Sequence, residues 1–289
     1  MILNFACIGV AGYIAPRHLH AIKILKHNLI LSYDKSNLVG ILNKFFPQSL
    51  FFNKFSQFKK KFINLKKKIN YTVILTPNHT HFYYIKFALS NGSNVICEKP
   101  LVLSEHHLKN IQKLENKYRR KVYTILQLRT LKEVKKLKIK IDKSKRKYDI
   151  NINYITPRGN LYKKSWKGNL KKSGGILFNI GIHLLDLLCY LFGKYTNCAL
   201  DKLANDRATG MIEFSNAKAK FYLSTNKQDL KNFKRKKVVR DFIINNNKID
   251  LVKNNEQAHN DSYREILNKK KFGLSSVKTA IQLAIDLQK

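Results

Sequence analysis

Short apolar runs alternate with helical patterns in the first part of the chain. Four runs have the length of buried strands: Leu3–Gly9, Leu29–Tyr33, Tyr71–Leu75 and Asn94–Cys97. The first leads through a glycine turn into a helical spacing of apolar residues. A second helical spacing covers His81–Ser90 and stops at Asn91 and Gly92, which favour a helix end. Strands that alternate with helices are typical of right-handed βαβ crossovers. The pattern predicts an α/β Rossmann domain with a doubly wound parallel sheet for residues 1–125.

The pattern changes after about residue 125. Lys147–Ile155 alternates between apolar and polar residues, as a half-buried strand does, and Phe178–Phe192 has helical spacing. Three more runs resemble short strands: Gly210–Phe214, Ala219–Leu223 and Phe242–Ile244. The basic segment Lys132–Lys147 is expected to form a surface helix near the junction. Residues 126–289 therefore predict an α+β domain with a largely antiparallel sheet.

The composition is that of a globular protein with an extreme positive charge. The 289 residues are 44% hydrophobic, and 56 Lys and Arg against 18 Asp and Glu give a net charge of +38. Such a charge attracts nucleic acid, anionic membranes or phosphorylated metabolites. The lysines are scattered through almost every segment, and no zinc-finger or aromatic RNA-binding motif accompanies them. We expect a general compositional drift and no specific nucleic-acid partner.

The cysteines and the apolar segments bear on location. Cys7, Cys97, Cys189 and Cys198 lie far apart and form no CxxC pair, so buried free thiols are expected and metal binding is not. The N-terminus lacks a basic region before its apolar run, and no apolar run in the sequence reaches the roughly 20 residues of a membrane helix. A cytoplasmic protein without a membrane partner is the expectation.

The first glycine turn has the position and residues of a dinucleotide site. The string GVAGYIA, residues 9–15, is a degenerate G-x-G-x-x-G between a strand and a helix, where backbone amides and the helix dipole favour a pyrophosphate. Its residues expected to touch the cofactor are Gly9, Ala11, Gly12, Tyr13 and Ile14. Asp34 ends the second strand, where a carboxylate accepts ribose hydroxyls and repels the 2′-phosphate of NADP. The turn predicts NAD; the alternative is an ordinary turn beside a surface aspartate.

Two later strand ends are expected to lie at the same crevice. Thr76, Pro77 and Asn78 follow one strand, with a capped turn as the alternative, and Glu98-Lys99-Pro100 follows the next. An ammonium at residue 99 would polarise a substrate oxygen and stabilise its developing negative charge. A surface salt bridge is the alternative for that pair.

A histidine-containing helix supplies a candidate base. Asn179 and His183 are four residues apart after Gly174 and Gly175, so they share a helix face. A lone histidine on an apolar helix is usually a core residue, but beside a lysine it can accept the proton of an alcohol. Asp186 either orients the imidazole or pairs with a lysine.

Together these motifs resemble the Gfo/Idh/MocA oxidoreductases, two-domain enzymes that use a nicotinamide cofactor and act mainly on sugars and cyclitols. The glycine turn, Glu98-Lys99-Pro100, and the Gly-Gly helix with His183 and Asp186 carry the resemblance. Many members have aspartate where this chain has Asn179, which leaves more of the proton chemistry to Lys99 and His183.

The asparagine and several strings are similar to one branch, which dehydrogenates UDP-N-acetylglucosaminuronate. These strings are residues 11–18, 95–101, 125–129, 154–160, 164–168 and 179–183. The branch implies oxidation of the sugar C3″ hydroxyl by NAD⁺ in surface polysaccharide (lipopolysaccharide O-antigen) biosynthesis, with Lys99 and His183 catalytic. It adds His81, Glu98, Lys99 and Gln127 to the cofactor site. The implied substrate-binding residues are Lys99, Arg129, Arg158, Tyr162, Ser165, Lys167, Asn179 and His183.

Other readings stay open. Each arginine or lysine is otherwise a solvated surface charge in so basic a chain. The branch also implies a homo-oligomer, a tetramer packed through the sheet of the second domain. The alternatives are another nucleotide-sugar or sugar dehydrogenase of the same family, or a non-catalytic basic descendant that binds NAD or nucleic acid.

Overall fold

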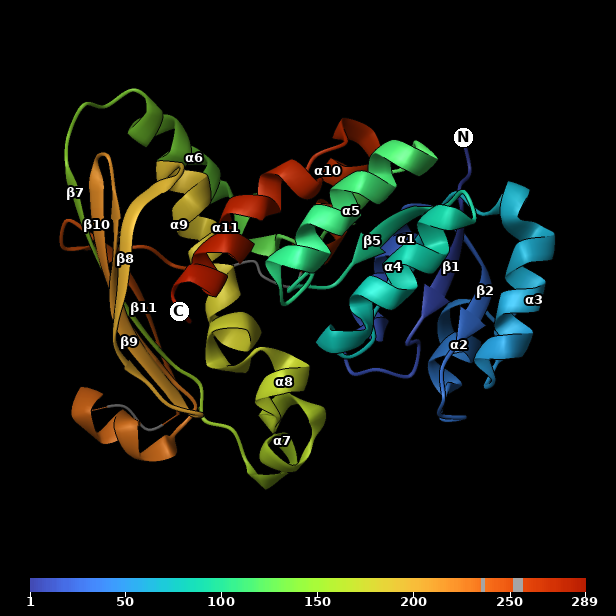
Figure 1. Ribbon diagram of the computed structural model, residues 1–289, viewed down its shortest axis with the longest axis horizontal. Helices are drawn as coiled ribbons and strands as arrows, with labels where there is room; N and C mark the ends of the chain where they lie inside the picture. Colours follow the sequence, from blue (N-terminus) through green and yellow to red (C-terminus); the bar gives the residue numbers. More distant parts are fainter. Residues whose placement is uncertain (235–236, 252–256) are drawn as a thin grey trace. The chain divides into compact units, whose positions relative to one another are not determined.

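The computed structural model describes residues 1–234, 237–251 and 257–289, which form two compact units (Figure 1). The described residues of the first unit are 1–102, 106–125 and 257–276. Those of the second are 103–105, 126–234, 237–251 and 277–289. The chain therefore returns to the first unit after leaving it, through a segment that follows the strands of the second.

The first unit contains a six-stranded parallel sheet. Its strands are β1 (Asn4–Ile8), β2 (Asn28–Tyr33), β3 (Leu50–Phe52), β4 (Tyr71–Ile74), β5 (Asn94–Cys97) and β6 (Val122–Thr124). Their order is β3-β2-β1-β4-β5-β6, and every neighbouring pair is parallel. The apolar runs are continuous because both faces of such a sheet are covered by helices. The order reverses at β1, which puts the switch point between β1 and β4.

Helices cover this sheet. They are α1 (Ala15–Ile24), α2 (Gly40–Phe45), α3 (Phe55–Leu65), α4 (His81–Ser90), α5 (Glu105–Tyr118) and α10 (Ala258–Lys269), with short turns η1 (Lys66–Lys68) and η2 (Asn78–Thr80). Phe55 and Phe58 of α3 pack against Tyr84 and Phe87 of α4, with ring centroids 5.3–6.4 Å apart. On another part of the unit α1 packs against α10. Tyr263 of α10 is fully buried and contacts Phe5 of β1.

The second unit contains a six-stranded mixed sheet. Its strands are β7 (Tyr148–Ile155), β8 (Tyr195–Leu203), β9 (Arg207–Phe214), β10 (Ala217–Ser224), β11 (Val239–Ile244) and β12 (Asn247–Lys248). The order is β12-β11-β7-β10-β9-β8, and only the β7–β10 pair is parallel. Both the parallel sheet and the largely antiparallel sheet predicted from the sequence are confirmed.

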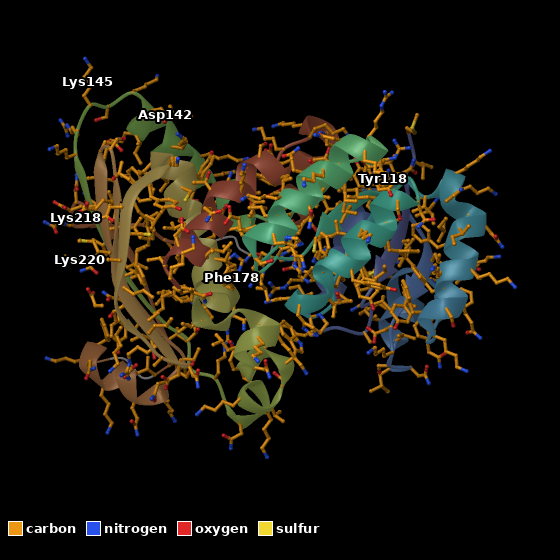
Figure 2. The ribbon with its side chains drawn as sticks, in the orientation of Figure 1. Tyr118, Asp142, Lys145, Phe178, Lys218 and Lys220 are labelled. Carbon is orange, nitrogen blue, oxygen red and sulfur yellow. The ribbon has the colours of Figure 1, made fainter. Side chains whose placement is uncertain are left out.

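One face of this sheet carries helices and the other carries charge. Phe192 of α9 (Ile182–Phe192) packs against Tyr148 of β7 and Phe214 of β9. Lys218 and Lys220 of β10 are exposed and point away from the sheet (Figure 2). The remaining elements are η3 (Gln127–Thr130), α6 (Lys132–Asp142), α7 (Asn160–Lys164), η4 (Trp166–Gly168), α8 (Leu170–Ser173), η5 (Leu177–Gly181), η6 (Lys227–Phe233) and α11 (Leu274–Asp286).

Two sequence predictions need correction. The basic helix α6 ends at Asp142, five residues before the expected end at Lys147. The expectation that no apolar segment approaches the length of a membrane helix is also wrong. Leu170–Phe192 forms a 23-residue helical stretch, long and apolar enough to cross a membrane; its most apolar 18-residue window has a mean hydropathy of 1.8, and 72% of that window is buried inside the protein. Such burial is that of a core helix.

Candidate active site

The glycine turn after β1 brings the backbone close to the neighbouring strand. Gly9 has φ +95°, and a Cβ there would lie 2.9 Å from the carbonyl carbon of Leu75. A Cβ on Gly12 would lie 3.2 Å from the Gly9 carbonyl oxygen. Only glycine fits at residue 9, because the conformation and the space both exclude a side chain. The turn therefore has the tight, side-chain-free geometry that a dinucleotide pyrophosphate requires, and α1 begins directly after it.

Asp34 closes this turn from the end of β2. Its Oδ2 accepts a hydrogen bond of 2.9 Å from the Ala11 amide, and its Oδ1 accepts one of 2.9 Å from the Ser36 amide. A carboxylate has about four acceptor sites, so two hydrogen bonds leave capacity for ribose hydroxyls. The other expected cofactor residues of the turn differ in exposure: Tyr13 is 87% exposed and Ile14 is half-buried.

His81 ties the end of β4 to the Glu98-Lys99-Pro100 step. Its Nε2 lies 2.8 Å from the Thr76 carbonyl oxygen and its Nδ1 lies 2.9 Å from the Pro100 carbonyl oxygen. The ring is fully buried, and burial lowers the pKa of His81 although both carbonyls oppose this. Asn78 is buried beside it, while Thr80 donates to Thr76 and to the Pro77 carbonyl. The two strand ends that the sequence pointed to are thus brought together, with His81 as their link.

Glu98 and Lys99 follow β5. The Lys99 amide donates to Glu98 Oε2 at 3.2 Å, and Glu98 Oε1 accepts from His18 Nε2 at 2.8 Å. Burial alone would raise the pKa of the Glu98 carboxyl, but the hydrogen bond from His18 and the nearby ring of His259 hold it well below its usual range. Glu98 is therefore an ionised carboxylate that orders the backbone at Lys99.

His183 lies in the first turn of α9 in the second unit, and Asn179 precedes it in η5. Asn179 Nδ2 donates to the Lys167 carbonyl oxygen at 3.1 Å. The carboxylate of Asp186 pairs with Arg129, whose Nε and Nη2 donate to its two oxygens at 2.8 and 2.6 Å. Burial raises the pKa of Asp186 and Arg129 opposes it. Asp186 thus binds an arginine, where the sequence suggested an imidazole or a lysine.

Arg129 and Gln127 lie in η3. Arg129 is 8% exposed, contacts the ring of Tyr190 at 5.0 Å and forms the ion pair with Asp186. Arg129 was predicted to bind the substrate as a cation. In the structure its guanidinium is already engaged in a buried ion pair with Asp186. Gln127 is half-buried, and its carbonyl oxygen accepts from Thr130 Oγ1 at 2.7 Å.

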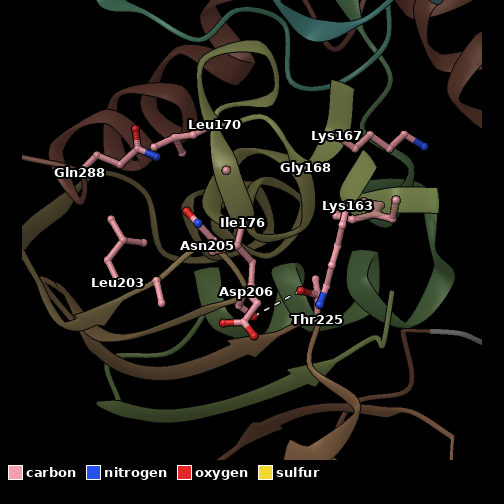
Figure 3. Close-up of a pocket in the computed structure, with 13 residues that line it drawn as sticks. Lys163, Lys167, Gly168, Leu170, Ile176, Leu203, Asn205, Asp206, Thr225 and Gln288 are labelled. Carbon is pink, nitrogen blue, oxygen red and sulfur yellow. Dashed lines mark hydrogen bonds between the residues drawn. The ribbon is translucent and has the colours of Figure 1, made fainter. Parts of the chain in front are cut away.

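The second unit holds a cavity of about 490 Å³ (Figure 3). Such a volume suits a small organic ligand or a large part of a nucleotide sugar. Two predicted substrate residues, Tyr162 and Lys167, line it. The other lining residues are Lys163, Gly168, Leu170, Gly175, Ile176, Leu203, Ala204, Asn205, Asp206, Thr225 and Gln288.

The predicted substrate residues of this region lie close together. Arg158 stacks on the ring of Tyr162 at 5.6 Å, and Ser165 Oγ donates to the Tyr162 carbonyl oxygen at 2.8 Å. Burial, with the charge of Arg158 second, lowers the pKa of Lys167. Burial raises the pKa of Tyr162, so its hydroxyl remains a hydrogen-bond donor. The exposed Arg158, the half-buried Lys167 and the phenol of Tyr162 thus form a site suited to an anionic ligand with hydrogen-bonding groups.

Asp206, Thr225 and Gln288 are cavity residues that sequence reasoning missed. Thr225 donates to the carbonyl oxygen of Asp206 (Figure 3). Gln288 donates to the Gly174 carbonyl oxygen at 2.9 Å. Asp206 belongs to the Asn205-Asp206 turn between β8 and β9, and Gln288 lies one residue before the end of the chain. No motif signals them, because the cavity gathers them from distant parts of the second unit.

The parallel sheet, the side-chain-free turn and the adjacent carboxylate define the first unit as a dinucleotide-binding Rossmann domain. The chain belongs to the Gfo/Idh/MocA oxidoreductase family: residues 3–125 match the family's NAD-binding Rossmann fold and residues 146–238 match its C-terminal alpha/beta domain. The resemblance predicted from the motifs is thereby confirmed, and NAD is the cofactor of the matched domain.

One solved dehydrogenase structure resembles this chain over its whole length. The chain is 34% identical to the WlbA (WbpB) dehydrogenase from Thermus thermophilus, with a TM-score of 0.94 over 100% of this chain and 95% of that chain. That protein was crystallised with NAD and alpha-ketoglutarate, and with NAD and UDP-GlcNAcA.

Two curated relatives match in part. Oxidoreductase P35 of Formosa agariphila is 29% identical over 169 residues, which is 51% of this chain and 50% of that protein. Glucose-6-phosphate 3-dehydrogenase of Bacillus subtilis is 26% identical over 197 residues, 64% of this chain and 53% of that protein. This chain spans about half the length of the curated relatives it matches.

Proposed function

We propose that the protein is an NAD-dependent dehydrogenase that oxidises the C3″ hydroxyl of UDP-N-acetylglucosaminuronate to the 3-keto sugar. The observation that carries this proposal is the likeness, over the whole chain, to a dehydrogenase crystallised with NAD and UDP-GlcNAcA. Lys99 and His183, the turn that Asp34 contacts, and the cavity lined by Tyr162 and Lys167 support it.

Lys99 and His183 carry the proposed proton chemistry. Bound NAD⁺ supplies the acceptor for the hydride that leaves C3″. The neutral imidazole of His183 accepts the proton of the C3″ hydroxyl, and the oxygen's electron pair then forms the carbonyl bond. The Lys99 ammonium donates to that oxygen and stabilises the charge that develops on it. Asp34 favours NAD over NADP, because its carboxylate repels a 2′-phosphate.

The cations of the second unit are assigned to the anionic groups of the substrate. Arg158 and Lys167 would bind the uronate carboxylate or the diphosphate, and Tyr162, Ser165 and Asn179 would bind sugar hydroxyls or the acetamido group. A bound anion also offsets the mutual repulsion between Arg158 and Lys167, which contributes to the lowered pKa of Lys167. The proposed physiological context is the synthesis of a surface polysaccharide.

A substrate panel tests this proposal. Purified protein is incubated with NAD⁺ and UDP-N-acetylglucosaminuronate, UDP-N-acetylglucosamine or glucose 6-phosphate, with and without 2-oxoglutarate as an acceptor that regenerates NAD⁺. NADH formation or keto-sugar formation with the uronate, and little with the uncharged sugar, is the expected result. No oxidation of the uronate under either condition contradicts the proposed substrate.

Glucose 6-phosphate is the second candidate substrate. It is favoured by the partial match to glucose-6-phosphate 3-dehydrogenase, which is named for oxidation at the same numbered sugar carbon. Preference for this compound over the uronate in the panel would assign the cations of the second unit to a phosphate monoester.

A further inference from the structure

A buried cluster in the first unit joins α1, α10 and the end of β5. His18 of α1 and Tyr263 of α10 are both 0% exposed, and His259 of α10 is 2% exposed. Glu98, at the end of β5, is the only carboxylate among them. Neither the cofactor turn nor the cavity of the second unit uses the two histidines or the tyrosine.

The hydrogen bonds of this cluster have one consistent direction. Glu98 Oε1 is an acceptor, so His18 Nε2 carries the proton of their 2.8 Å hydrogen bond. A neutral imidazole then has a lone pair on Nδ1, which lies 2.9 Å from the Tyr263 hydroxyl and accepts its proton. Glu98 Oε2 accepts from the Lys99 amide at 3.2 Å. The chain runs from Tyr263 through His18 and Glu98 to the backbone of Lys99, with every one of these groups satisfied.

The pKa shifts of His18 and Glu98 agree with this assignment of donors and acceptors. Burial lowers the pKa of His18, and it does so against the hydrogen bond and charge of Glu98. Contacts with the two histidines hold the pKa of Glu98 low although burial opposes this. A neutral donor and an ionised acceptor are therefore the stable pair near neutral pH.

His259 completes the surroundings of the carboxylate. Its Nε2 lies 3.6 Å from Glu98 Oε1, and its ring meets that of His18 edge to face at 5.2 Å. Neither ring nitrogen of His259 has a hydrogen-bond partner within the described ranges 1–234, 237–251 and 257–289. Two histidines and a carboxylate are also a donor set that zinc accepts. A metal on His18 Nε2 would displace the proton of the hydrogen bond to Glu98, so the metal site and the hydrogen bond are mutually exclusive alternatives.

We infer that Tyr263, His18 and Glu98 form a hydrogen-bonded chain that positions Lys99, with His259 as a second contact to the carboxylate. This rests on the proposed function, in which Lys99 binds the reacting oxygen. His18 is a positioning residue that acts through Glu98. The hydrogen-bonded chain affects catalysis because the amide of Lys99 and its side chain share one Cα. The carboxylate that orders the amide therefore also limits where the ammonium lies. A small displacement of such a group costs a large factor in rate.

Two substitutions at His18 separate positioning from packing. In His18→Gln the side-chain amide still donates to Glu98 and accepts from Tyr263, whereas His18→Leu fills the space without either hydrogen bond. The leucine variant is expected to lower kcat by about 10- to 100-fold at a nearly unchanged KM for the substrate. The glutamine variant should keep most of the rate. If packing is the only role, leucine is tolerated at least as well as glutamine, and that result overturns the inference.

Tyr263→Phe covers the case in which His18→Leu does not fold. It removes one hydroxyl and leaves the ring in the core, so a fall in kcat without a rise in KM is again expected. The matched control is His20→Leu on the exposed face of the same helix α1, which should leave both constants unchanged. A wild-type kcat in Tyr263→Phe would contradict the proposed role of the hydrogen-bonded chain.

A measurement without substrate keeps this inference separate from the proposed function. NMR of the protein with isotopically labelled histidine, assigned with His18→Gln, should show His18 neutral with its proton on Nε2, and Tyr263→Phe should shift its Nδ1 resonance. These signals support the chain even if the uronate is not oxidised. Opposite protonation, with the proton on Nδ1, overturns it. So does one tightly bound zinc per chain that His259→Gln removes.

Discussion

At the scale of single residues, Gly9 combines a backbone conformation and a close backbone contact that both exclude a side chain. Its φ of +95° and the Leu75 backbone 2.9 Å from a built Cβ exclude a side chain. Gly9→Ala is expected to destabilise the protein by roughly 1–3 kcal/mol and to weaken NAD binding, because the turn must move to relieve the clash. Urea unfolding and NAD titration measure both effects. Gly40→Ala, where no atom lies within 4 Å of the new Cβ, is the control and should be neutral or stabilising.

Asp34 is expected to select the cofactor. Asp34→Asn keeps the shape of the side chain and removes the charge that repels a 2′-phosphate, although its NH2 group replaces one of the two oxygens that accept from the Ala11 and Ser36 amides and cannot accept in its place. The ratio of the NADP to the NAD dissociation constant should fall on the order of tenfold. Fluorescence titration with both reduced cofactors measures it, and an unchanged ratio would remove Asp34 from the selection of NAD.

Sequence motifs predicted the site residues that stand at recognisable positions along the chain. They did not predict interactions between residues that are far apart in the sequence. Gly9, Asp34 and Lys99 stand at strand ends that any parallel sheet brings to one edge. The partners of His18, by contrast, are 80 and 245 residues away in sequence. Arg129 looked like a free cation because nothing in a single sequence shows that Asp186, 57 residues later, binds it in the core.

At the scale of elements, the Arg129–Asp186 pair joins η3 to α9. Asp186→Ala leaves a buried guanidinium without its carboxylate and is expected to cost about 3–5 kcal/mol of unfolding free energy. Asp142→Ala is the matched control: it removes the exposed Lys138–Asp142 pair within α6 and should cost about 0.5 kcal/mol or less. Urea unfolding compares the two. Equal, small effects would show that the buried pair contributes little.

The elements with strong periodicity were predicted well, and those defined by tertiary contacts were not. His81–Ser90 and Asn94–Cys97 have the bounds read from the sequence. Helix α10, AHNDSYREILNK, has so many polar residues that it resembles a surface helix. Eight of its residues are nevertheless buried, including His259 and Tyr263. Polar residues in a core need buried partners, and partners cannot be read from periodicity.

At the scale of the whole molecule, buried histidines predict a loss of stability in mild acid. Burial lowers the pKa values of His18 and His81 from 6.5. The unfolded chain therefore binds protons below about pH 6.5 that the folded chain does not, and stability falls as the pH falls. Two such groups contribute roughly 2 kcal/mol between about pH 7.5 and pH 5.5. Urea unfolding at both pH values measures this.

His81→Asn should reduce that pH dependence, whereas His20→Asn, at an exposed position of α1, should leave it unchanged. Stability that is flat or rises toward pH 5.5 in the wild-type protein would show that the histidines are not held neutral by burial.

The division of the whole chain could be predicted only in outline. The change from alternating strands and helices to a run of strands marks the start of the second unit near residue 126. The return of residues 257–276 to the first unit has no signal in composition, because it depends on the packing of α10 against α1. The net charge of +38 is likewise a property of the surface and carries no information about the fold.

Transfer of a labelled hydride tests the central claim most directly. UDP-N-acetylglucosaminuronate that carries deuterium at C3″ is incubated with the protein and NAD⁺, and the reduced cofactor is analysed by mass spectrometry. The account predicts that the deuterium appears in the reduced nicotinamide, together with a 3-keto sugar. Reduced cofactor without deuterium, or no reduced cofactor and no keto sugar, would contradict it.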